Sequence, residues 1–331
     1  MRIEKFETWM CKRPKGLFDE EREGAAPMPW SYGVGRITTS DGVEGIATFW
    51  AARSAAVTDA YLSDVIAPVI LGRSIHDRER IWQDFWNIDR HGAFFPVFLP
   101  GPIDVALWDA AARTAGLPLH QYLGSYRTSL PVYASSLWLP DIDAYVREAL
   151  AYKERGFKAY KVHPCGPSTL DMEIHQAVRD AVGPDMILMT DPVAEYSLHE
   201  AIKVARHLEE LNYYWFEEPF RDYELDKYAK LSAAVDIPIV GTETTRGGPW
   251  GVAQAIKADA LDMVRADVSW KGGITGTLKV CHLAEAHGMN CELHTTTMGP
   301  MDVANIHVAC AVRNSDYFGL FVPEDTFQLP M

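Results

Sequence analysis

The sequence has no long apolar run and no excess of positive charge. No segment of its 331 residues approaches the roughly 20 apolar residues that a transmembrane helix needs, and the first ten, MRIEKFETWM, lack the apolar core of a signal peptide. Lys and Arg total 31 against 45 Asp and Glu, which gives a formal net charge of -14 at pH 7. This balance argues against general nucleic-acid binding, and the sequence predicts a protein that does not span a membrane.

Paired cysteines are also lacking. The five cysteines are scattered, odd in number and form no C-x-x-C motif. This pattern favours reduced thiols in a cytoplasmic protein over a disulfide framework or a zinc site. The cysteines are Cys11, Cys165, Cys281, Cys291 and Cys310.

Apolar runs alternate with amphipathic helical segments from about residue 131 onward. Gly156 and Gly288 mark the ends of two of these helices, and Ser197 and Glu200 have the spacing of a capping box at the start of a third. Eight strand-then-helix units of this kind predict a (β/α)₈ barrel over residues 128–331. The runs cover residues 131–139, 158–163, 186–191, 213–218, 237–243, 260–267, 290–294 and 317–324.

The first 127 residues predict a separate α+β capping domain. Residues 35–50 have the pattern of a hairpin with its turn at the sequence SDG, followed by three helical segments at 55–70, 75–88 and 102–115. The segment 16–33 is polar and irregular, and is interpreted either as a lid over an active site or as a surface insertion.

Ionisable residues stand at the ends of most of the predicted strands. In a parallel barrel such residues project into one mouth, where three successive carboxylates would repel each other unless a positive charge neutralises them. A hard divalent cation such as Mg²⁺ is the simplest solution, because it prefers oxygen ligands. A glycosidase would need only two of these acids, and each acid alone could cap a helix. The residues are Lys161, His163, Asp191, Glu217, Glu243, Asp267, His294 and Glu324.

Several motifs resemble those of the enolase superfamily, in its mandelate racemase-like subgroup. The segment 101–135, GPIDVALWDAAARTAGLPLHQYLGSYRTSLPVYAS, is similar to the family's junction between capping domain and barrel. The motifs MTDP, WFEEP and VGTE are similar to its three metal-ligand strands. The resemblance implies Mg²⁺ as cofactor, held by Asp191, Glu217 and Glu243, with Glu218 on the opposite face of its strand.

The last strands extend the resemblance. It implies that Asp267 orients His294 as an acid–base dyad, and that Glu324 is a protonated group that hydrogen-bonds the substrate carboxylate. It also implies a homo-oligomer and a C-terminal tail that packs back on the capping domain. The sequence ends at Met331, seven residues after Glu324.

The second barrel strand departs from the subgroup. Where the subgroup carries Lys-x-Lys, this sequence has Lys161 and His163. His163 is interpreted as the base, since histidine titrates near neutral pH, with Lys161 or His294 as the alternatives. Lys271 stands directly before two glycines, which does not suit the base of the muconate-lactonizing branch.

The resemblance implies removal of the proton α to a carboxylate, followed by β-elimination of water from an acid sugar to give a 2-keto-3-deoxy acid. Racemisation or epimerisation with the same residues is the second interpretation, and a non-catalytic barrel that binds acid sugars is the third. Four residues are candidates for contacts with a small carboxylate substrate: Arg22, Trp30, Tyr32 and Arg246.

Overall fold

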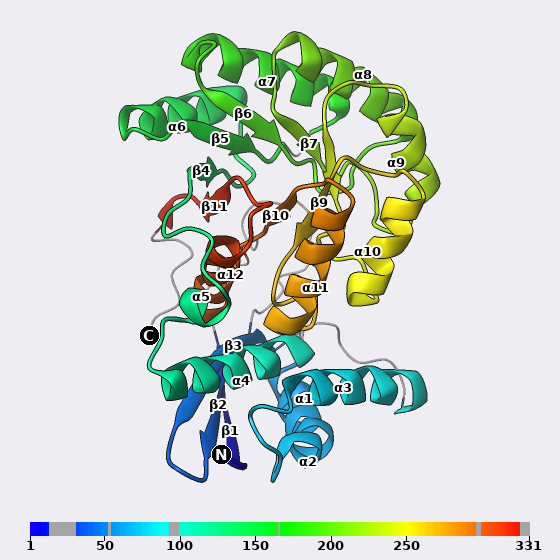
Figure 1. The fold of residues 1–331 in the computed structure, drawn as a ribbon. Helices are drawn as coiled ribbons and strands as arrows, with labels where there is room; N and C mark the ends of the chain where they lie inside the picture. The colour runs from blue at the N-terminus through cyan, green and yellow to red at the C-terminus, as the bar shows by residue number, and fades with distance from the viewer. Residues whose placement is uncertain (13–30, 52–53, 93–98, 165, 296–298, 325–331) are drawn as a thin grey trace.

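The structure is a computed structural model, which describes residues 1–12, 31–51, 54–92, 99–164, 166–295 and 299–324. Its larger part is a closed barrel of eight parallel strands, in the order β10-β11-β4-β5-β6-β7-β8-β9 (Figure 1). Each strand falls inside one of the eight predicted runs, so the barrel prediction is confirmed. The strands are β4 (Val132–Ser135), β5 (Ala159–Val162), β6 (Ile187–Thr190), β7 (Trp215–Glu217), β8 (Ile239–Gly241), β9 (Met263–Ala266), β10 (Cys291–Leu293) and β11 (Phe318–Phe321).

Helices follow the strands and cover the outside of the barrel (Figure 1). The predicted capping box is present at the start of α8, where Ser197 and Glu200 exchange hydrogen bonds. Gly156 and Gly288 both have positive φ, of 95° and 72°, as residues that end a helix often do. The barrel helices are α6 (Ile142–Glu154), α7 (Ser168–Val182), α8 (Leu198–Glu210), α9 (Leu225–Ser232), α10 (Gly248–Lys257), α11 (Gly273–Ala286) and α12 (Pro300–Ala311).

The N-terminal part is an α+β cap with a three-stranded antiparallel sheet. The predicted hairpin is β2–β3, but the prediction missed β1, which pairs with β2. Residues 31–33 belong to β2, so the prediction of a loop over 16–33 is wrong there, and residues 16–30 lie outside the described residues. The cap elements are β1 (Ile3–Lys12), β2 (Ser31–Thr39), β3 (Glu44–Trp50), α1 (Ala55–Tyr61), η1 (Leu62–Ile66), α2 (Ala67–Ile70), α3 (Arg78–Gly92), α4 (Pro100–Ala115) and α5 (Leu119–Tyr122).

The cap is joined to the barrel through α4 and α11. The buried carboxylate of Asp104 accepts hydrogen bonds from the backbone N–H of Thr275, at 2.8 Å, and from its hydroxyl, at 2.6 Å. Burial raises the pKa of Asp104 to about 7. The indole of Trp82 in α3 donates to the carbonyl oxygen of Gly272, at 2.8 Å. These buried contacts fix the cap over one side of the barrel.

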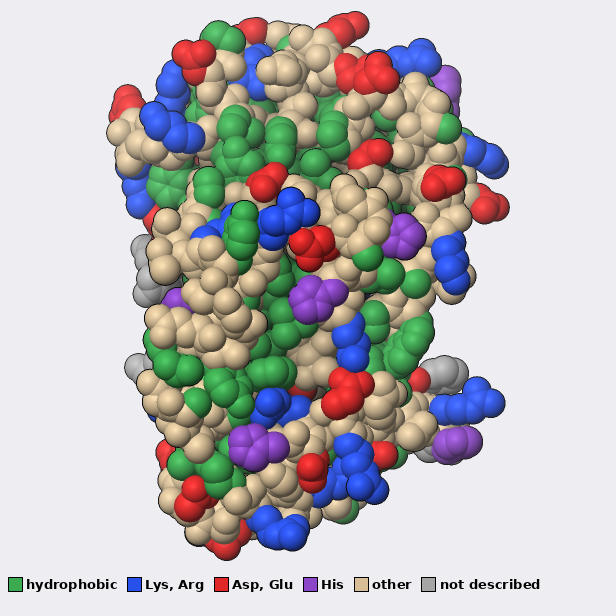
Figure 2. Space-filling model, viewed as in Figure 1, with side chains coloured by type: hydrophobic (Ala, Val, Ile, Leu, Met, Phe, Trp, Pro, Cys, Tyr) green, Lys and Arg blue, Asp and Glu red, His purple; other side chains and the backbone are tan. Residues whose placement is uncertain are grey.

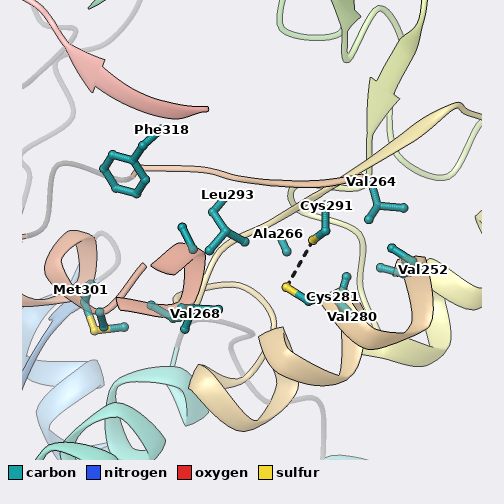
Figure 3. Packing of buried hydrophobic residues seen from close by; sticks show 14 of the residues in the cluster. Val252, Val264, Ala266, Val268, Val280, Cys281, Cys291, Leu293, Met301 and Phe318 are labelled. Atoms are coloured by element: carbon teal, nitrogen blue, oxygen red, sulfur yellow. Dashed lines mark hydrogen bonds between the residues drawn. The ribbon is translucent and has the colours of Figure 1, made fainter. Parts of the chain in front are cut away.

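Apolar side chains fill the space between the strands and the helices. Figure 3 shows one such region, where Cys281 of α11 faces Cys291 of β10 among Val264, Leu293 and Met301. The thiol of Cys281 donates a hydrogen bond to Sγ of Cys291 at 3.6 Å, and the two form no disulfide. The described cysteines are all free thiols, as predicted, and Cys165 lies outside the described residues.

The described surface carries charges of both signs. Figure 2 shows acidic and basic side chains interspersed over one face of the molecule. Among the described helices, none has the length and apolar character that crossing a bilayer requires.

The close approach of β3 to α4 gives a stability prediction. A Cβ on Gly45 would lie 1.9 Å from the carbonyl oxygen of Ala106, so Gly45→Ala should lower the free energy of unfolding by about 1–3 kcal/mol. Gly35→Ala in β2 is the matched control, because its Cβ would meet Phe49 at 3.4 Å and Phe6 at 3.5 Å. Urea unfolding of both variants measures the difference, and equal effects would contradict the described packing.

Candidate active site

A cavity of about 900 Å³ lies at the carboxyl ends of the barrel strands, where Trp50 of the cap contributes to its wall. The side chains that line it follow several different strands, as expected for the mouth of a parallel barrel. Five of the predicted site residues are among them. They are His163, Asp191, Glu243, Arg246 and His294.

His294 and Asp267 form the predicted pair. Nδ1 of His294 is 3.0 Å from Oδ2 of the buried Asp267, whose Oδ1 accepts a hydrogen bond from the backbone N–H of Ser269 at 2.6 Å. Nε2 of His294 faces Oε2 of Glu243 at 3.5 Å. Burial acts to lower the pKa of His294, but the carboxylates of Glu243 and Asp267 outweigh it and raise the pKa. These two carboxylates therefore favour the protonated form of the imidazole.

His163 is anchored in a similar way. Its Nδ1 is 2.7 Å from the carbonyl oxygen of Ser136, which can only accept, so Nδ1 carries a proton. The hydroxyl of Ser136 accepts from the backbone N–H of His163 at 3.0 Å, and Tyr145 donates to the carbonyl oxygen of His163 at 2.6 Å. Nε2 is 3.2 Å from Oδ2 of Asp191, to which it can donate only when it also carries a proton. Loss of that proton leaves the lone pair of the ring on Nε2.

One aromatic ring meets both histidines. Phe321, at the end of β11, stacks on His163 with ring centroids 5.9 Å apart. The same ring meets His294 in a T-shaped arrangement at 6.2 Å. The two imidazoles therefore reach one cavity from β5 and β10, and each turns its Nε2 toward a carboxylate.

Lys161 lies below the cavity rather than in its wall. Its buried ammonium group donates to Oε2 of Glu217 at 2.9 Å and to Oδ2 of Asp191 at 3.2 Å. Burial acts to lower the pKa of Lys161, but Glu217, Tyr133 and Asp191 together outweigh it and raise the pKa. Arg265 of β9, which the sequence analysis missed, contacts Oε1 of Glu217 at 2.7 Å. Arg265 lies two residues before Asp267, as Lys161 lies two residues before His163. This spacing could have identified Arg265 from the sequence.

The three predicted metal ligands follow β6, end β7 and follow β8. In the part of the chain that the structure describes, no three His, Cys, Asp or Glu side chains are grouped closely enough to hold a cation as they stand. Asp191 and Glu217 form ion pairs with Lys161. Burial and the carboxylates of Asp191 and Glu217 raise the pKa of Glu243, and His294 acts to lower it. Carboxylate oxygens are the donors that a hard divalent cation prefers, so the donor set fits Mg²⁺ in kind, although it is not gathered around one point in this structure.

Glu218 is a fourth carboxylate at the site. It lines the cavity, and its Oε1 accepts a hydrogen bond from the backbone N–H of Glu243 at 3.0 Å. Burial, with Asp222 and Glu243, raises its pKa well above the usual range. Glu217 instead points into the barrel interior, so the two neighbours face opposite ways, as the sequence indicated.

The backbone is strained at the same strand ends. Four residues other than glycine have positive φ there: Val193 at 55°, Ala194 at 64°, Glu218 at 40° and Thr242 at 81°. Such conformations cost free energy and are concentrated at functional sites. They follow Asp191 and Glu217 and precede Glu243, so the strain coincides with the carboxylates.

Glu324 is not part of this site, which corrects the role implied for it. Its carboxylate accepts hydrogen bonds from Arg155 of α6, at 2.5 Å and 3.2 Å, and from Tyr152 at 3.0 Å. The hydrogen bonds from Arg155 lower the pKa of Glu324 to about 2, so it is ionised rather than protonated. Phe321 occupies the cavity wall at the end of this strand instead.

The other candidates are placed differently. Arg246 lines the cavity, whereas Tyr32 pairs across the sheet with Trp50 and is not among the lining residues. Arg22 and Trp30 lie outside the described residues. Lys271 is buried and donates to the carbonyl oxygens of Thr242 and Thr245, which agrees with its exclusion as a base. Several lining residues were not predicted from the sequence: Trp50, Trp138, Arg221, Tyr223, Trp270 and Phe321.

A capped (β/α)₈ barrel with histidines and carboxylates converging on one mouth defines the class of enzyme. The chain belongs to the mandelate racemase/muconate lactonizing enzyme family of the enolase superfamily. Residues 30–124 match the N-terminal domain of that family, and residues 144–329 match the enolase C-terminal domain-like family. The predicted family is therefore confirmed, and with it the prediction of an enzyme.

Three relatives illustrate the similarity. The L-talarate/galactarate dehydratase of Salmonella typhimurium is 31% identical over 81% of this chain and 71% of its own length. The D-galactarolactone cycloisomerase of Agrobacterium fabrum is 31% identical over 78% of this chain and 69% of its own. The solved structure of D-glucarate dehydratase from Agrobacterium tumefaciens, complexed with magnesium, aligns with a TM-score of 0.86 and 32% identity, over 96% of this chain and 86% of that one.

The raised pKa of Glu243 gives a second prediction. A carboxylate with a raised pKa in the folded state destabilises the fold as pH rises above its unfolded value of about 4.3. Glu243→Gln should therefore raise the melting temperature of the protein without added metal, and this gain should grow from pH 4 towards neutral pH. Glu324→Gln is the control, since it removes a carboxylate that Arg155 stabilises, and it should not raise the melting temperature. Equal shifts would refute the assignment.

Proposed function

We propose that this chain is a Mg²⁺-dependent acid-sugar dehydratase. The reaction breaks the C–H bond α to a carboxylate and the C–O bond of the β-hydroxyl, releases water, and gives an enol that tautomerises to a 2-keto-3-deoxy acid. One observation carries the proposal: His163 and His294 reach the same cavity from β5 and β10, each with Nδ1 held by the protein. The dehydratases among the relatives support this reaction class.

His163 is assigned as the base. The carbonyl oxygen of Ser136 holds the proton on Nδ1 and leaves the lone pair on Nε2, which is the atom that removes the α-proton. Lys161 is a poor alternative, because it is buried and donates to both Glu217 and Asp191. Its charge lies close enough to the carboxylates to orient them.

His294 is assigned as the acid. With Nδ1 hydrogen-bonded to Asp267, the imidazolium form is stabilised and its Nε2 proton can be given to the departing β-hydroxyl. In each turnover His163 gains a proton and His294 loses one. Proton exchange with solvent then returns both residues to their starting states.

Asp191, Glu217 and Glu243 would hold the cation, with Glu218 beside them. When bound, Mg²⁺ supplies positive charge that offsets these carboxylates and the negative charge that develops on the substrate carboxylate. Asp191 and Glu243 are at present the partners of the two Nε2 atoms. If Asp191 and Glu243 held the cation instead, the Nε2 atoms of both imidazoles would face the substrate.

An isomerase is the second candidate. The same pair of imidazoles could remove and return a proton at one carbon, and a cycloisomerase is among the relatives of similar identity. Loss of water distinguishes the two outcomes.

The reaction is tested with a panel of aldonates and aldarates. We expect 2-keto-3-deoxy products, detected with semicarbazide, in the presence of Mg²⁺ and none in EDTA. Exchange of the α-proton in D₂O without loss of water would favour the isomerase. Neither product nor exchange with any substrate would contradict the proposal.

Variants of the two histidines distinguish the base from the acid. His163→Asn should lower turnover by about 100- to 10,000-fold and abolish α-proton exchange in D₂O, because the base is lost. His294→Asn should lower turnover in the same range but retain exchange, because only elimination needs the acid. Exchange is followed by ¹H NMR, and normal exchange in the His163 variant would assign the base to another residue.

A further inference from the structure

Two arginines line the same cavity as the two histidines. Arg221 follows β7 and Arg246 follows β8, and among the described residues of the cavity wall they are the Lys or Arg side chains present. Within the described ranges neither guanidinium group forms an ion pair with a carboxylate. An arginine beside a cavity without a carboxylate partner is available to an anion.

The nearby carboxylates are already engaged. Glu224 pairs with Lys227 at 2.5 Å and accepts from the backbone N–H of Arg221 at 3.3 Å. Asp222 accepts a hydrogen bond from the hydroxyl of Thr244. Glu224 interacts electrostatically with Arg221, but among the described residues neither acid forms an ion pair with its guanidinium group.

The loops that carry the two arginines are tied together. The hydrogen bond from Thr244 to Asp222 joins the loop after β7 to the loop after β8, next to Arg221 and two residues before Arg246. The bond from the backbone N–H of Glu243 to Glu218 joins them a second time. These links hold the two arginines to one side of the cavity mouth.

The cavity wall is rich in negative charge, so a substrate with two anionic groups depends on the two arginines. Four carboxylates line the wall, and the whole chain carries a net charge of -14, so a second anionic group on a substrate would be repelled without local cations. The four are Asp191, Glu218, Asp222 and Glu243.

We propose that Arg221 and Arg246 form a distal subsite for a second carboxylate, so that the enzyme prefers dicarboxylic acid sugars to monocarboxylic ones. The subsite rests on the proposed function for the reacting end of the substrate. Trp50 of the cap and Trp270 of the barrel line the same cavity as a stacked pair, with ring centroids 6.1 Å apart. Such rings suit the C–H faces of a sugar chain.

Kinetics with matched substrates tests the preference. The full chain with Mg²⁺ should turn over six-carbon aldarates with a higher kcat/KM than aldonates of the same configuration. Arg221→Gln and Arg246→Gln should each lower kcat/KM for aldarates by about 10- to 100-fold and leave the value for aldonates nearly unchanged. Lysine at either position should restore part of the loss. Arg206→Gln, on an exposed part of α8, is the control.

Binding of acids that cannot be dehydrated tests the subsite independently of the dehydration reaction. Adipate, a six-carbon dicarboxylate without hydroxyl groups, should bind more tightly than hexanoate by calorimetry, and the double arginine variant should lose the difference. Equal binding of the two acids, or an equal loss of aldarate and aldonate turnover in the arginine variants, would overturn the subsite. Selective adipate binding without any dehydration would support the subsite and refute only the dehydratase.

Discussion

The ion pairs of Glu217 with Lys161 and Arg265 are the interaction on which the site depends. All three side chains are buried, and a buried charge without a partner would cost several kcal/mol. The strands β5, β7 and β9 must therefore keep their register for these charges to meet. Because Lys161 also reaches Asp191, the same interaction fixes the carboxylate that faces His163.

The alternation of side chains along the strands connects this charged layer to the chemistry. Lys161 lies inside the barrel and His163, two residues later, reaches the cavity above it. Arg265 of β9 and Asp267, which directly follows the strand, repeat the pattern, and Asp267 is hydrogen-bonded to Nδ1 of His294. The protein thus orients each imidazole through Nδ1 and leaves Nε2 for proton transfer.

Much of this arrangement could be predicted from the sequence, because parallel strands covered on both faces form continuous apolar runs at regular spacing. The strand β1 was missed since its half-exposed residues resemble a loop until it pairs with β2. Glu324 was misplaced because its partner Arg155 is far away in the sequence. The contact of His163 with the carbonyl oxygen of Ser136 involves backbone atoms that a sequence does not specify.

The central claim is that Nε2 of His163 is the basic atom. Nitrogen-15 NMR of histidine-labelled protein, with Mg²⁺ added and the His163→Asn variant used to assign the signals, measures this directly. We expect a protonated Nδ1 and an unprotonated Nε2 for His163 near neutral pH. A proton on Nε2 with Nδ1 unprotonated would contradict the account.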